Sequence, residues 1–498
     1  MANPECSLSV HRPILWQLLT HPRSIALVDD RRTTRNYELL AGLFHIAHKL
    51  EAVNHTQRLG LLLPTGGTFP AAALAGLTLG RTIVPLNYLL KKEELQYVID
   101  DCGTDTIVTV RPMLDHLGYS PKVKNLVYLE DVDFSGMPDI RWPAEPADDD
   151  LAVLLYTSGT SGKPKGVMLT HGNLTSNIRQ VRDWVDFSRA DSMLGVLPQF
   201  HSFGLTVLTL LPLSGGIKVI YTARFIPGKI VRLLREHRPT VLVAIPSMYN
   251  ALLHAKDATP DDFKSLRYTV SGGEPLPGAV RDKFRERFGV TINEGYGLTE
   301  TSPVTNWCRP HEFRPGSVGR PIPLIDQRII DTATGRTLPP NTDGEVWMRG
   351  PNIMRGYYNL PTETSKAFSD SGYFRTGDIG RFDDDGHLHI TGRLKEMLII
   401  GGENVFPREI EEVLERHPSV SASGVVGVSD NMRGELPVAF VEIREGATFD
   451  EKELIGWCRQ HLAGYKVPDM VRRLDALPRN ATGKVMRREL KTLAANAQ

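Results

Sequence analysis

Residues 151–167 read LAVLLYTSGTSGKPKGV, and the change of character within this stretch gives the first structural prediction. Leu151–Tyr156 is an unbroken apolar run of the length typical of a buried strand. The residues that follow are mostly glycines, hydroxyl side chains and the two lysines Lys163 and Lys165. Glycines let backbone N–H groups turn toward an anion, and hydroxyls and lysines add donors and positive charge. A loop of this composition directly after a strand, at the edge where open α/β sheets bind ligands, predicts a polyphosphate site.

Two common phosphate-binding motifs do not fit the loop. A Walker loop has the pattern G-x-x-x-x-G-K-[ST], but the residue at the place of the second glycine, counted from Gly159, is Pro164. The Rossmann pattern G-x-G-x-x-G is also absent here. A flexible surface loop is the plain alternative, and the particular order of twelve residues argues against it.

Composition narrows the class of protein. The 498 residues are 41% hydrophobic and 23% charged, which is typical of a globular chain with a large core. Lys+Arg and Asp+Glu are both 58, so a zero net charge gives no electrostatic case for a nucleic-acid partner. Cys6, Cys102, Cys308 and Cys458 are far apart, which favours a reducing, cytoplasmic compartment. Neither a signal-peptide pattern nor an apolar run of about 18 residues is found, so no transmembrane segment is expected.

The order of patterns along the chain predicts an α/β protein with two domains. Apolar strands alternate with helical patterns over residues 58–110 and again over 228–297, which indicates two parallel-type α/β subdomains. After about residue 310, short alternating segments rich in Gly and Pro predict a small antiparallel, β-barrel-like subdomain. We expect these parts to form a large N-terminal domain, residues 1–394, followed by a small mobile α+β domain, residues 395–498.

Five motifs in a fixed order resemble those of the adenylate-forming (ANL) superfamily, which contains acyl-CoA synthetases, peptide-synthetase adenylation domains and luciferases. They are YTSGTSGKPKGV (156–167), YGLTE (296–300), FRTGD (374–378), GRLKEMLIIGGENV (392–405) and PRNATGK (478–484). The resemblance covers nearly the whole chain. It implies a two-step reaction, in which a carboxylate attacks the α-phosphate of ATP to give acyl-AMP and pyrophosphate, and a thiol then displaces AMP to give a thioester.

The resemblance also implies roles for single residues at the nucleotide. Thr299 corresponds to the contact with the α-phosphate and Glu300 to the Mg²⁺ ligand, since one carboxylate suits a metal that shares its shell with phosphates and water. Tyr296 would stack on adenine, Asp378 would accept the ribose hydroxyls, and Arg393 would contact ribose or phosphate. The rest of the expected ATP/AMP set comprises Thr157, Ser158, Gly159, Thr160, Ser161, Gly162, Lys163, Lys165, Gly273, Glu274, Pro275, Gly295 and Gly297.

The C-terminal motifs imply the parts of the machinery that move. Lys484 resembles the catalytic lysine that stabilises the charge building up on the α-phosphorus during adenylation. Lys395 occupies the hinge position about which the C-terminal domain is expected to turn. Gly401 and Gly402 resemble the loop that lines the tunnel for the thiol arm of CoA. The spacing of Pro478 and Lys484 also resembles sites of lysine acetylation, so a protein acetyltransferase and a deacetylase are candidate partners. The expected cofactors are therefore ATP, Mg²⁺ and CoA.

The acid is predicted from the segment LPQFHSFGL, residues 197–205. His201 resembles the residue that gates the acyl site, and adenylation domains for amino acids usually carry an aspartate here, so an amino-acid substrate is not expected. The resemblance implies an uncharged acyl pocket in which glycines leave room for the substrate, so that Gly273→Leu would favour shorter acids. The pocket residues are Phe203, Val207, Val270, Gly273, Gly295, Gly297, Pro303, Val304 and Thr305.

We therefore expect an acyl-CoA synthetase for a medium- or long-chain aliphatic acid. An aryl (4-coumarate-like) CoA ligase, an acyl-[acyl-carrier-protein] ligase and, by fold alone, a luciferase remain alternatives within the superfamily. A non-catalytic nucleotide or acyl-AMP sensor is the alternative from another class, and the joint presence of Thr299, Glu300 and Lys484 argues against it. His387 and His389 have metal-like spacing without an evident third ligand, so we expect exposed strand histidines there.

Overall fold

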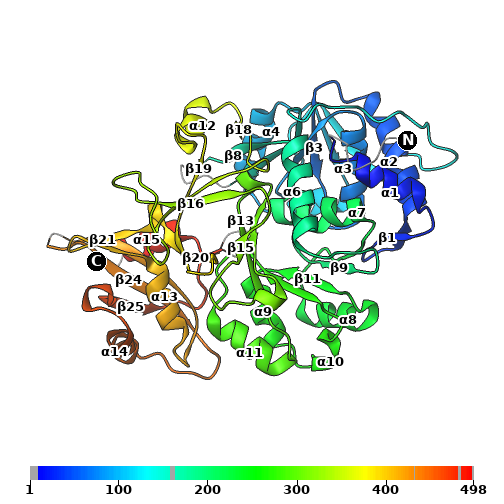
Figure 1. Cartoon of the computed structure of the whole chain (residues 1–498). Helices are drawn as coiled ribbons and strands as arrows, with labels where there is room; N and C mark the ends of the chain where they lie inside the picture. Colours follow the sequence, from blue (N-terminus) through cyan, green and yellow to red (C-terminus); the bar gives the residue numbers. More distant parts are fainter. Residues whose placement is uncertain (1–8, 158–162, 431, 480–483, 496–498) are drawn as a thin grey trace.

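The computed structural model describes residues 9–157, 163–430, 432–479 and 484–495 (Figure 1). The predictions for Ser158, Gly159, Thr160, Ser161 and Gly162 therefore lie outside the described residues. Within these ranges no helix is both long enough and apolar enough to cross a bilayer.

The first sheet has seven strands and contains the apolar run of the opening stretch. Its order is β18-β8-β7-β4-β3-β5-β6, and the five strands from β7 to β6 are parallel, whereas β8 and β18 are antiparallel additions. The strands are β3 (Arg58–Leu62), β4 (Thr82–Pro85), β5 (Thr106–Thr109), β6 (Asn125–Tyr128), β7 (Leu151–Thr157), β8 (Lys165–Thr170) and β18 (Gly356–Tyr357). The helices of this region are α2 (Asn36–Glu51), α3 (Thr68–Thr78), α4 (Lys92–Cys102), α5 (Arg111–Leu117) and α6 (His171–Trp184). The glycine-rich loop thus follows a strand with a parallel neighbour, as predicted, but it leads into an antiparallel strand.

The second sheet has nine strands in the order β15-β14-β13-β12-β11-β9-β10-β1-β2, parallel from β13 to β1. The strands are β1 (Ile25–Val28), β2 (Thr33–Arg35), β9 (Ser192–Gly195), β10 (Lys218–Tyr221), β11 (Val241–Ala244), β12 (Tyr268–Ser271), β13 (Asn293–Gly297), β14 (Val304–Trp307) and β15 (Arg320–Pro321). The accompanying helices are α1 (Arg12–Thr20), α7 (Leu211–Gly215), α8 (Pro227–His237), α9 (Pro246–Leu253), α10 (Pro260–Phe263), α11 (Gly278–Phe288) and the π-helix η3 (Phe203–Leu210). Both α/β units predicted from the alternating pattern are present.

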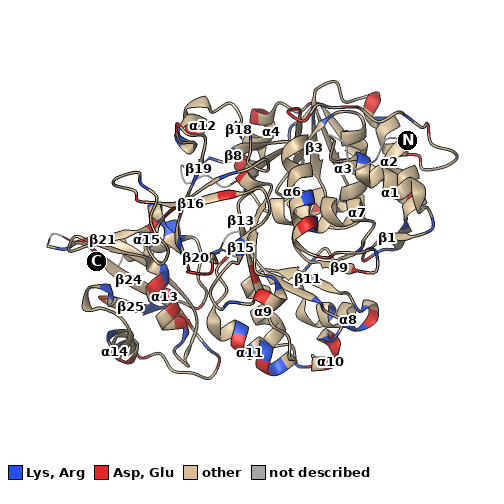
Figure 2. Cartoon of the chain, viewed as in Figure 1, with Lys and Arg blue, Asp and Glu red and all other residues tan. Residues whose placement is uncertain are grey.

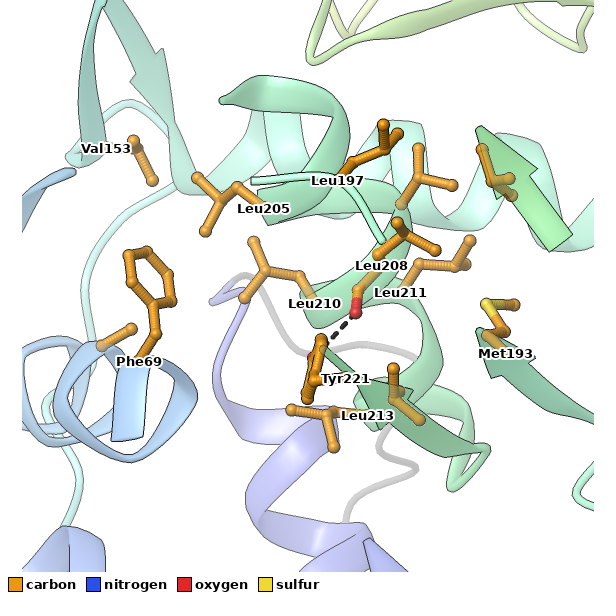
Figure 3. Close-up of a cluster of buried hydrophobic side chains, with 14 of the residues drawn as sticks. Phe69, Val153, Met193, Leu197, Leu205, Leu208, Leu210, Leu211, Leu213 and Tyr221 are labelled. Atoms are coloured by element: carbon orange, nitrogen blue, oxygen red, sulfur yellow. Dashed lines mark hydrogen bonds between the residues drawn. The ribbon is translucent and has the colours of Figure 1, made fainter. Parts of the chain in front are cut away.

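A single apolar core joins the two sheets around helix η3 (Figure 3). Phe69 of α3 and Val153 of β7 lie on one side of Leu205 and Leu210, and Tyr221 of β10 lies on the other. The hydroxyl of Tyr221 donates to the carbonyl of Leu208 at 2.8 Å, so its polar group is satisfied inside the core. This packing fixes the helix that begins at Phe203, two residues after His201.

The third sheet is antiparallel and stands where the barrel-like subdomain was expected. Its order is β16-β17-β19-β20, with β16 (Asp326–Ile330), β17 (Gly344–Arg349), β19 (Phe374–Phe382) and β20 (Leu388–Arg393), and α12 (Pro361–Ala367) precedes β19. The expectation that both histidines of the β19–β20 hairpin are exposed is wrong for His387, which is 3% exposed. The turn is closed by Asp383, whose carboxylate accepts the backbone N–H of His387 at 2.9 Å and folds that residue inward.

The C-terminal part has its own sheet and two small apolar cores (orange to red in Figure 1). Its strands are β21 (Leu398–Ile400), β22 (Glu403–Val405), β23 (Val420–Asp430), β24 (Gly434–Ile443) and β25 (Met470–Arg473), and its helices are α13 (Pro407–Glu415), α14 (Glu451–His461) and α15 (Arg487–Ala495). Short helical turns lie at η2 (Leu129–Asp131), η4 (Thr299–Thr301), η5 (Pro310–Glu312), η6 (Leu394–Glu396) and η7 (Gly464–Lys466). The predicted fold class is confirmed: an α/β chain with two largely parallel sheets, an antiparallel sheet and a separate C-terminal domain.

Candidate active site

A buried carboxylate, Asp378, joins three elements of the fold. It lies on β19 directly opposite Arg393 of β20, and its side chain is 2% exposed. Arg393 Nε donates to Asp378 Oδ1 at 2.7 Å, while the hydroxyl of Tyr296, on β13, donates to Oδ2. A carboxylate offers about four acceptor positions, so two remain for the hydroxyls of a sugar. Burial and the Asp378 charge raise the pKa of Tyr296, which keeps the phenol protonated as a donor.

The residues Thr299 and Glu300 lie in η4, immediately beyond β13. The hydroxyl of Tyr357, on β18, donates to Glu300 Oε1 at 2.9 Å, and Ser202 Oγ lies 3.2 Å from Thr299 Oγ1. Burial raises the pKa of the Glu300 carboxyl. Among the described residues no group of three His, Cys, Asp or Glu side chains forms a preformed metal cage. A partly buried carboxylate whose Oε1 accepts from Tyr357 fits Mg²⁺ that brings its other ligands from nucleotide phosphates and water.

The described part of the glycine-rich loop reaches the same region through Lys165. Its ammonium donates to Glu363 of α12 at 2.7 Å and lies 5.4 Å from the centre of the Tyr357 ring. Tyr357 therefore connects Lys165 with Glu300. Lys163 lies instead over the ring of Tyr97, 5.3 Å from its centre. Thr157 pairs with Lys165 at the end of the β7–β8 hairpin.

Two different structural features explain why glycine occupies particular positions of the site. A Cβ on Gly297 would lie 1.8 Å from the carbonyl oxygen of Pro303, and one on Gly295 would lie 3.4 Å from that of Asn306. The space beside Gly297 is thus filled by the backbone that precedes β14, whereas a Cβ on Gly295 would make only ordinary van der Waals contacts. Gly273 differs, because its φ of +83° is in the left-handed region that favours glycine. Of its neighbours, Glu274 is partly buried and Pro275 is exposed.

Lys484 lies among charged groups of the large domain. Burial and the neighbouring Arg393 lower the pKa of its ammonium, whereas the charges of Glu396 and Asp378 act in the opposite direction. Burial raises the pKa of Glu274, and the charges of Arg479 and Lys484 oppose that rise. The C-terminal tail therefore places an ammonium beside the Asp378–Arg393 pair and the segment after β12.

A cavity of about 910 Å³ leads away from this region. Its lining includes His201, Phe203, Gly273, Glu274 and Arg479, and burial lowers the pKa of His201 to about 4, so its imidazole is neutral. Most of the lining is apolar, and the charged residues Asp30, Arg31 and Arg224 are exposed at its rim. The remaining lining residues are Asp29, Pro64, Thr65, Gly66, Thr68, Tyr88, Leu89, Val110, Pro112, Met113, His116, Val196, Leu197, Pro198, Ala223, Phe225, Ile245, Ser247, Met248 and Ala251.

Only part of the predicted acyl set borders this cavity. Phe203 and Gly273 do, whereas Val207, Val270 and residues 303–305 are buried in the core and are not part of its lining. The hydroxyl of Thr305 already donates to the carbonyl of Tyr296 at 3.2 Å. The expectation that Gly297 leaves room for the substrate is wrong in this structure, since the backbone carbonyl of Pro303 occupies that room.

The predicted hinge and tunnel residues lie at the start of the C-terminal part. Lys395 is the middle residue of η6, between the last strand of the third sheet and the first strand of the C-terminal sheet. Gly401 and Gly402 form the exposed two-residue turn between β21 and β22, with φ values of +59° and +89°. Their roles as hinge and tunnel lining stay predictions.

Several site residues were not predicted from the sequence. They are Tyr357, Glu363, Ser202 and Arg479, each of which contacts a motif residue or borders the cavity with one. Tyr357 lies in a segment, GPNIMRGYY, that itself resembles the family, so a signal for it existed. Arg479 lies within the PRNATGK motif and Ser202 within the segment LPQFHSFGL, whereas Glu363 belongs to no motif and only the fold gives it its partner.

Comparison with known proteins agrees with this geometry. The family model described as AMP-binding enzyme matches residues 15–358, and that of the AMP-binding enzyme C-terminal domain matches residues 409–484. The chain therefore belongs to the AMP-binding enzymes of the adenylate-forming superfamily, within the AMP-forming acid–thiol ligases of acyl-CoA synthetase type.

Relatives of this chain include enzymes for chemically different acids. It is 34% identical over 478 residues to a long-chain-fatty-acid–CoA ligase of Bacillus subtilis, covering 87% of this chain and 85% of the relative. It is also 34% identical over 463 residues to a feruloyl-CoA synthase of an Amycolatopsis species, covering 91% and 92%.

Solved structures resemble the whole chain. The ATP-bound MatB of Rhodopseudomonas palustris superposes with a TM-score of 0.89 at 30% identity, covering 98% of this chain and 99% of MatB. The apo form of the same protein covers the same shares with a TM-score of 0.79 at 31% identity. The arrangement of this chain is thus closer to the ATP-bound form of MatB.

Proposed function

We propose that this protein is an ATP-dependent acyl-CoA synthetase that activates an apolar carboxylic acid as its acyl-AMP and transfers the acyl group to CoA. The observation that carries the proposal is that Lys484 lies within electrostatic range of Asp378, Arg393 and Glu274 of the large domain. An ammonium at that point can stabilise negative charge that develops on the α-phosphate while the carboxylate attacks.

The nucleotide is proposed to lie across the motif residues. Asp378 has free acceptor positions for the ribose hydroxyls, and Thr299 and Arg393 lie where the α-phosphate would follow. Glu300 would hold Mg²⁺ together with phosphate oxygens, and the metal would neutralise charge on the leaving pyrophosphate. Since burial raises the pKa of Glu300, its proton competes with the metal, and added Mg²⁺ should restore activity at mildly acidic pH.

The acid is proposed to be apolar, with a medium- or long-chain aliphatic acid as the first choice. At about 910 Å³ the cavity lies near the upper end of the range of about 300–1,000 Å³ that is common for ligand sites. Its lining includes aliphatic, aromatic and thioether side chains, among them Ile245, Met248 and Phe225. An aryl acid is the second candidate, and the similarity to a feruloyl-CoA synthase supports testing it.

The acceptor is proposed to be CoA, whose thiol arm would share the cavity. Arg31 and Arg224 are exposed at its rim, and neither guanidinium is paired with another side chain within the described part of the chain. Two available arginines suit the phosphates of a nucleotide-bearing thiol. A carrier protein would present the same arm from a larger surface, so an acyl-[acyl-carrier-protein] ligase remains the alternative.

One experiment tests both choices. Pyrophosphate release is measured with straight-chain acids from acetate to palmitate, a cinnamate and an amino acid, first with free CoA and then with a phosphopantetheinylated carrier protein. We expect rates to rise with chain length and free CoA to support turnover. An optimum at acetate or at the amino acid would refute the apolar acid. Turnover with the carrier protein alone would show that the carrier protein, and not CoA, is the acceptor. Absence of pyrophosphate release with every acid would favour a sensor.

Three further expectations remain proposals. The domain boundary is placed at residues 394 and 395, with residues 395–498 as the mobile unit. A cytoplasmic location rests on the spacing of the cysteines alone.

Acetylation of Lys484 would remove the ammonium and switch off adenylation. Mass spectrometry of protein from cells with excess acetyl donor should find the modified lysine. Its consistent absence would refute this regulation.

A further inference from the structure

The side chain of Arg487, the first residue of α15, bonds three partners of the C-terminal part. Its Nε donates to Glu396 Oε2 at 2.9 Å, its Nη2 donates to Glu411 Oε2 at 2.9 Å, and its Nη1 donates to the carbonyl of Val425 at 2.8 Å. Nη1 also bonds Glu411 Oε1, so the contact with that carboxylate is bidentate. Such a two-point contact fixes the orientation of a guanidinium as well as its position.

Glu396 connects this network to the predicted hinge. It is the last residue of η6 and directly follows Lys395, and its side chain is 28% exposed. Lys484 precedes Arg487 by three residues, and Glu396 and Arg487 act on the ammonium of Lys484 with opposite sign. The pair between Arg487 and Glu396 therefore joins the tail that carries Lys484 to the segment at which the domain is expected to turn.

We propose that Arg487 and Glu396 form a positioning pair, which holds Lys484 at the site during acyl-adenylate formation without touching the substrate. The pair concerns the first half-reaction, which is common to the family whatever the acid, so the inference goes beyond the proposed choice of acid and acceptor. The simple alternative is a contact that only stabilises the C-terminal domain.

The surroundings of the pair decide which variants are informative. Figure 2 shows acidic residues gathered along α13, and Glu411, Glu412 and Glu415 are among them. Arg408 bonds Glu412, so Arg487 is the cation that neutralises Glu411. Removal of Arg487 to alanine would leave the partly buried carboxylates of Glu396 and Glu411 without this cation, which is expected to destabilise the domain. Glu396→Gln and Arg487→Lys are milder, because each preserves most of the side-chain volume.

The half-reactions separate positioning from mere stability. In Glu396→Gln and Arg487→Lys, acyl-AMP formation should fall about tenfold to a hundredfold, as expected when a catalytic group is misplaced by about 1 Å. Thioester formation from supplied acyl-AMP should stay within about twofold of the parent. Arg488→Lys and Glu489→Gln are matched controls on the exposed face of α15 and should leave both steps unchanged. Equal loss in both half-reactions, or no loss in either, would overturn the proposal.

A second readout needs no substrate. The backbone N–H of Met486, between Lys484 and Arg487, donates to the carbonyl of Pro478 at 2.7 Å. If the pair holds this segment, hydrogen exchange at Met486 should accelerate in Glu396→Gln while exchange in the core strand β24 stays unchanged. Unchanged protection at Met486 would count against the pair as a positioning element.

The pH dependence of adenylation is a third readout, because the alkaline limb is expected to shift in opposite directions in two variants. The charged groups facing Lys484 are Asp378 on β19, Arg393 on β20, Glu396 on η6, Glu274 after β12 and Arg487 on α15. Loss of the Glu396 charge should lower the pKa of Lys484 and move the alkaline limb of adenylation to lower pH. Loss of positive charge in Arg487→Gln should move that limb to higher pH. Shifts of the alkaline limb in the same direction, or no shift in either variant, would overturn the proposal. This test can be made with any acid that the substrate panel identifies.

Discussion

Arg393 and Asp378 are direct partners in the register of β19 and β20, and their side chains are bonded at 2.7 Å. The same carboxylate accepts a hydrogen bond from the hydroxyl of Tyr296, which lies in a different sheet. Motifs that are 82 residues apart in sequence thus meet at one buried acid. The site lies where the carboxyl end of β13 in the nine-stranded sheet, the antiparallel sheet and the C-terminal tail come together.

Lys484→Ala should abolish acyl-AMP formation and spare thioester formation from supplied acyl-AMP. The lysine works as an ammonium, and burial together with Arg393 lowers its pKa. The parent enzyme should therefore lose adenylation on the alkaline side at a lower pH than an ordinary lysine would allow. Single-turnover assays of both steps measure the effect, with Lys491→Ala, at an exposed site of α15, as the control. Loss of both half-reactions would point to misfolding or to a wrong role.

Lys395→Pro should preserve adenylation and impair thioester formation. Proline fixes φ near −65°, so a hinge at this position would be held in one arrangement. The resemblance to ATP-bound MatB suggests that the retained arrangement is the one for the first step. Lys395→Ala is the matched control, because it removes the same side chain and leaves φ free. If both steps run at the parental rate in the proline variant, the hinge lies elsewhere.

Ala251→Phe should shift the preferred acid to shorter chains, and Met248→Ala should shift it to longer ones. Both residues line the cavity from α9, so the first fills space and the second creates it. Each buried methylene contributes about 0.8 kcal/mol, close to fourfold in binding. Gly273→Leu is a poor probe, because at a φ of +83° any side chain strains the backbone. A raised KM for CoA with unchanged chain preference would show that the cavity serves the thiol arm alone.

Arg224→Gln should raise the KM for CoA several-fold and leave kcat and the KM for the acid unchanged. Its guanidinium is exposed at the rim of the cavity, where it would meet a phosphate and not the acyl chain. Because such a contact is screened by salt, the difference between variant and parent should shrink as ionic strength rises. The exposed Arg232 on α8 does not line the cavity, so Arg232→Gln should behave like the parent. An effect on the acid instead would place the acyl chain at the rim.

Glu415→Gln should stabilise the protein at pH 8 and change little at pH 5. Burial and the nearby charge of Glu411 raise the pKa of Glu415 to about 8, from an ordinary value of 4.5. Between these values the folded chain holds a proton that the unfolded chain releases, so the free energy of unfolding falls as pH rises through this window. Glutamine is neutral throughout and can still accept from the backbone N–H of Ser423, which lies 3.1 Å from Oε1.

Thermal unfolding midpoints at the two pH values test this expectation. The exposed Glu445 provides a matched control, since Glu445→Gln should leave the midpoint unchanged at both. A Glu415→Gln variant that is destabilised equally at pH 5 and pH 8 would show that packing, and not the proton, dominates at this position.

The sequence was a good guide to the sheets and the motifs, for identifiable reasons. Continuous apolar runs such as Leu151–Tyr156 are typical of strands buried on both faces, and they lie in the parallel sheets as expected. Asp378, Glu300 and Arg393 belong to local motifs, so their neighbours in sequence were sufficient to identify them. The structure then brings these three within mutual electrostatic range.

Contacts between distant segments could not be predicted in the same way. Glu363 is an ordinary helix residue until the fold brings it to Lys165, 198 positions away. The pairing of Arg487 with Glu396 spans 91 positions and leaves no periodic pattern. His387 was misjudged because strand alternation was extended to a residue that precedes β20 and belongs to the turn, where its backbone N–H donates to Asp383. Gly297 resembled a pocket residue, yet it makes room for the backbone at Pro303.

The turn at Gly401 and Gly402 bears on how substitution data for this chain are to be understood. Both residues have open space around a Cβ, but both have positive φ. Alanine at either position would therefore be tolerated by volume and opposed by the backbone, at a cost of about 1–2 kcal/mol. Asparagine accepts the left-handed conformation more readily, so it adds bulk with less strain. In a mutational scan, a position that accepts asparagine and rejects alanine reports the geometry of the turn. Rejection of both residues would support the predicted passage of a thiol arm at this turn.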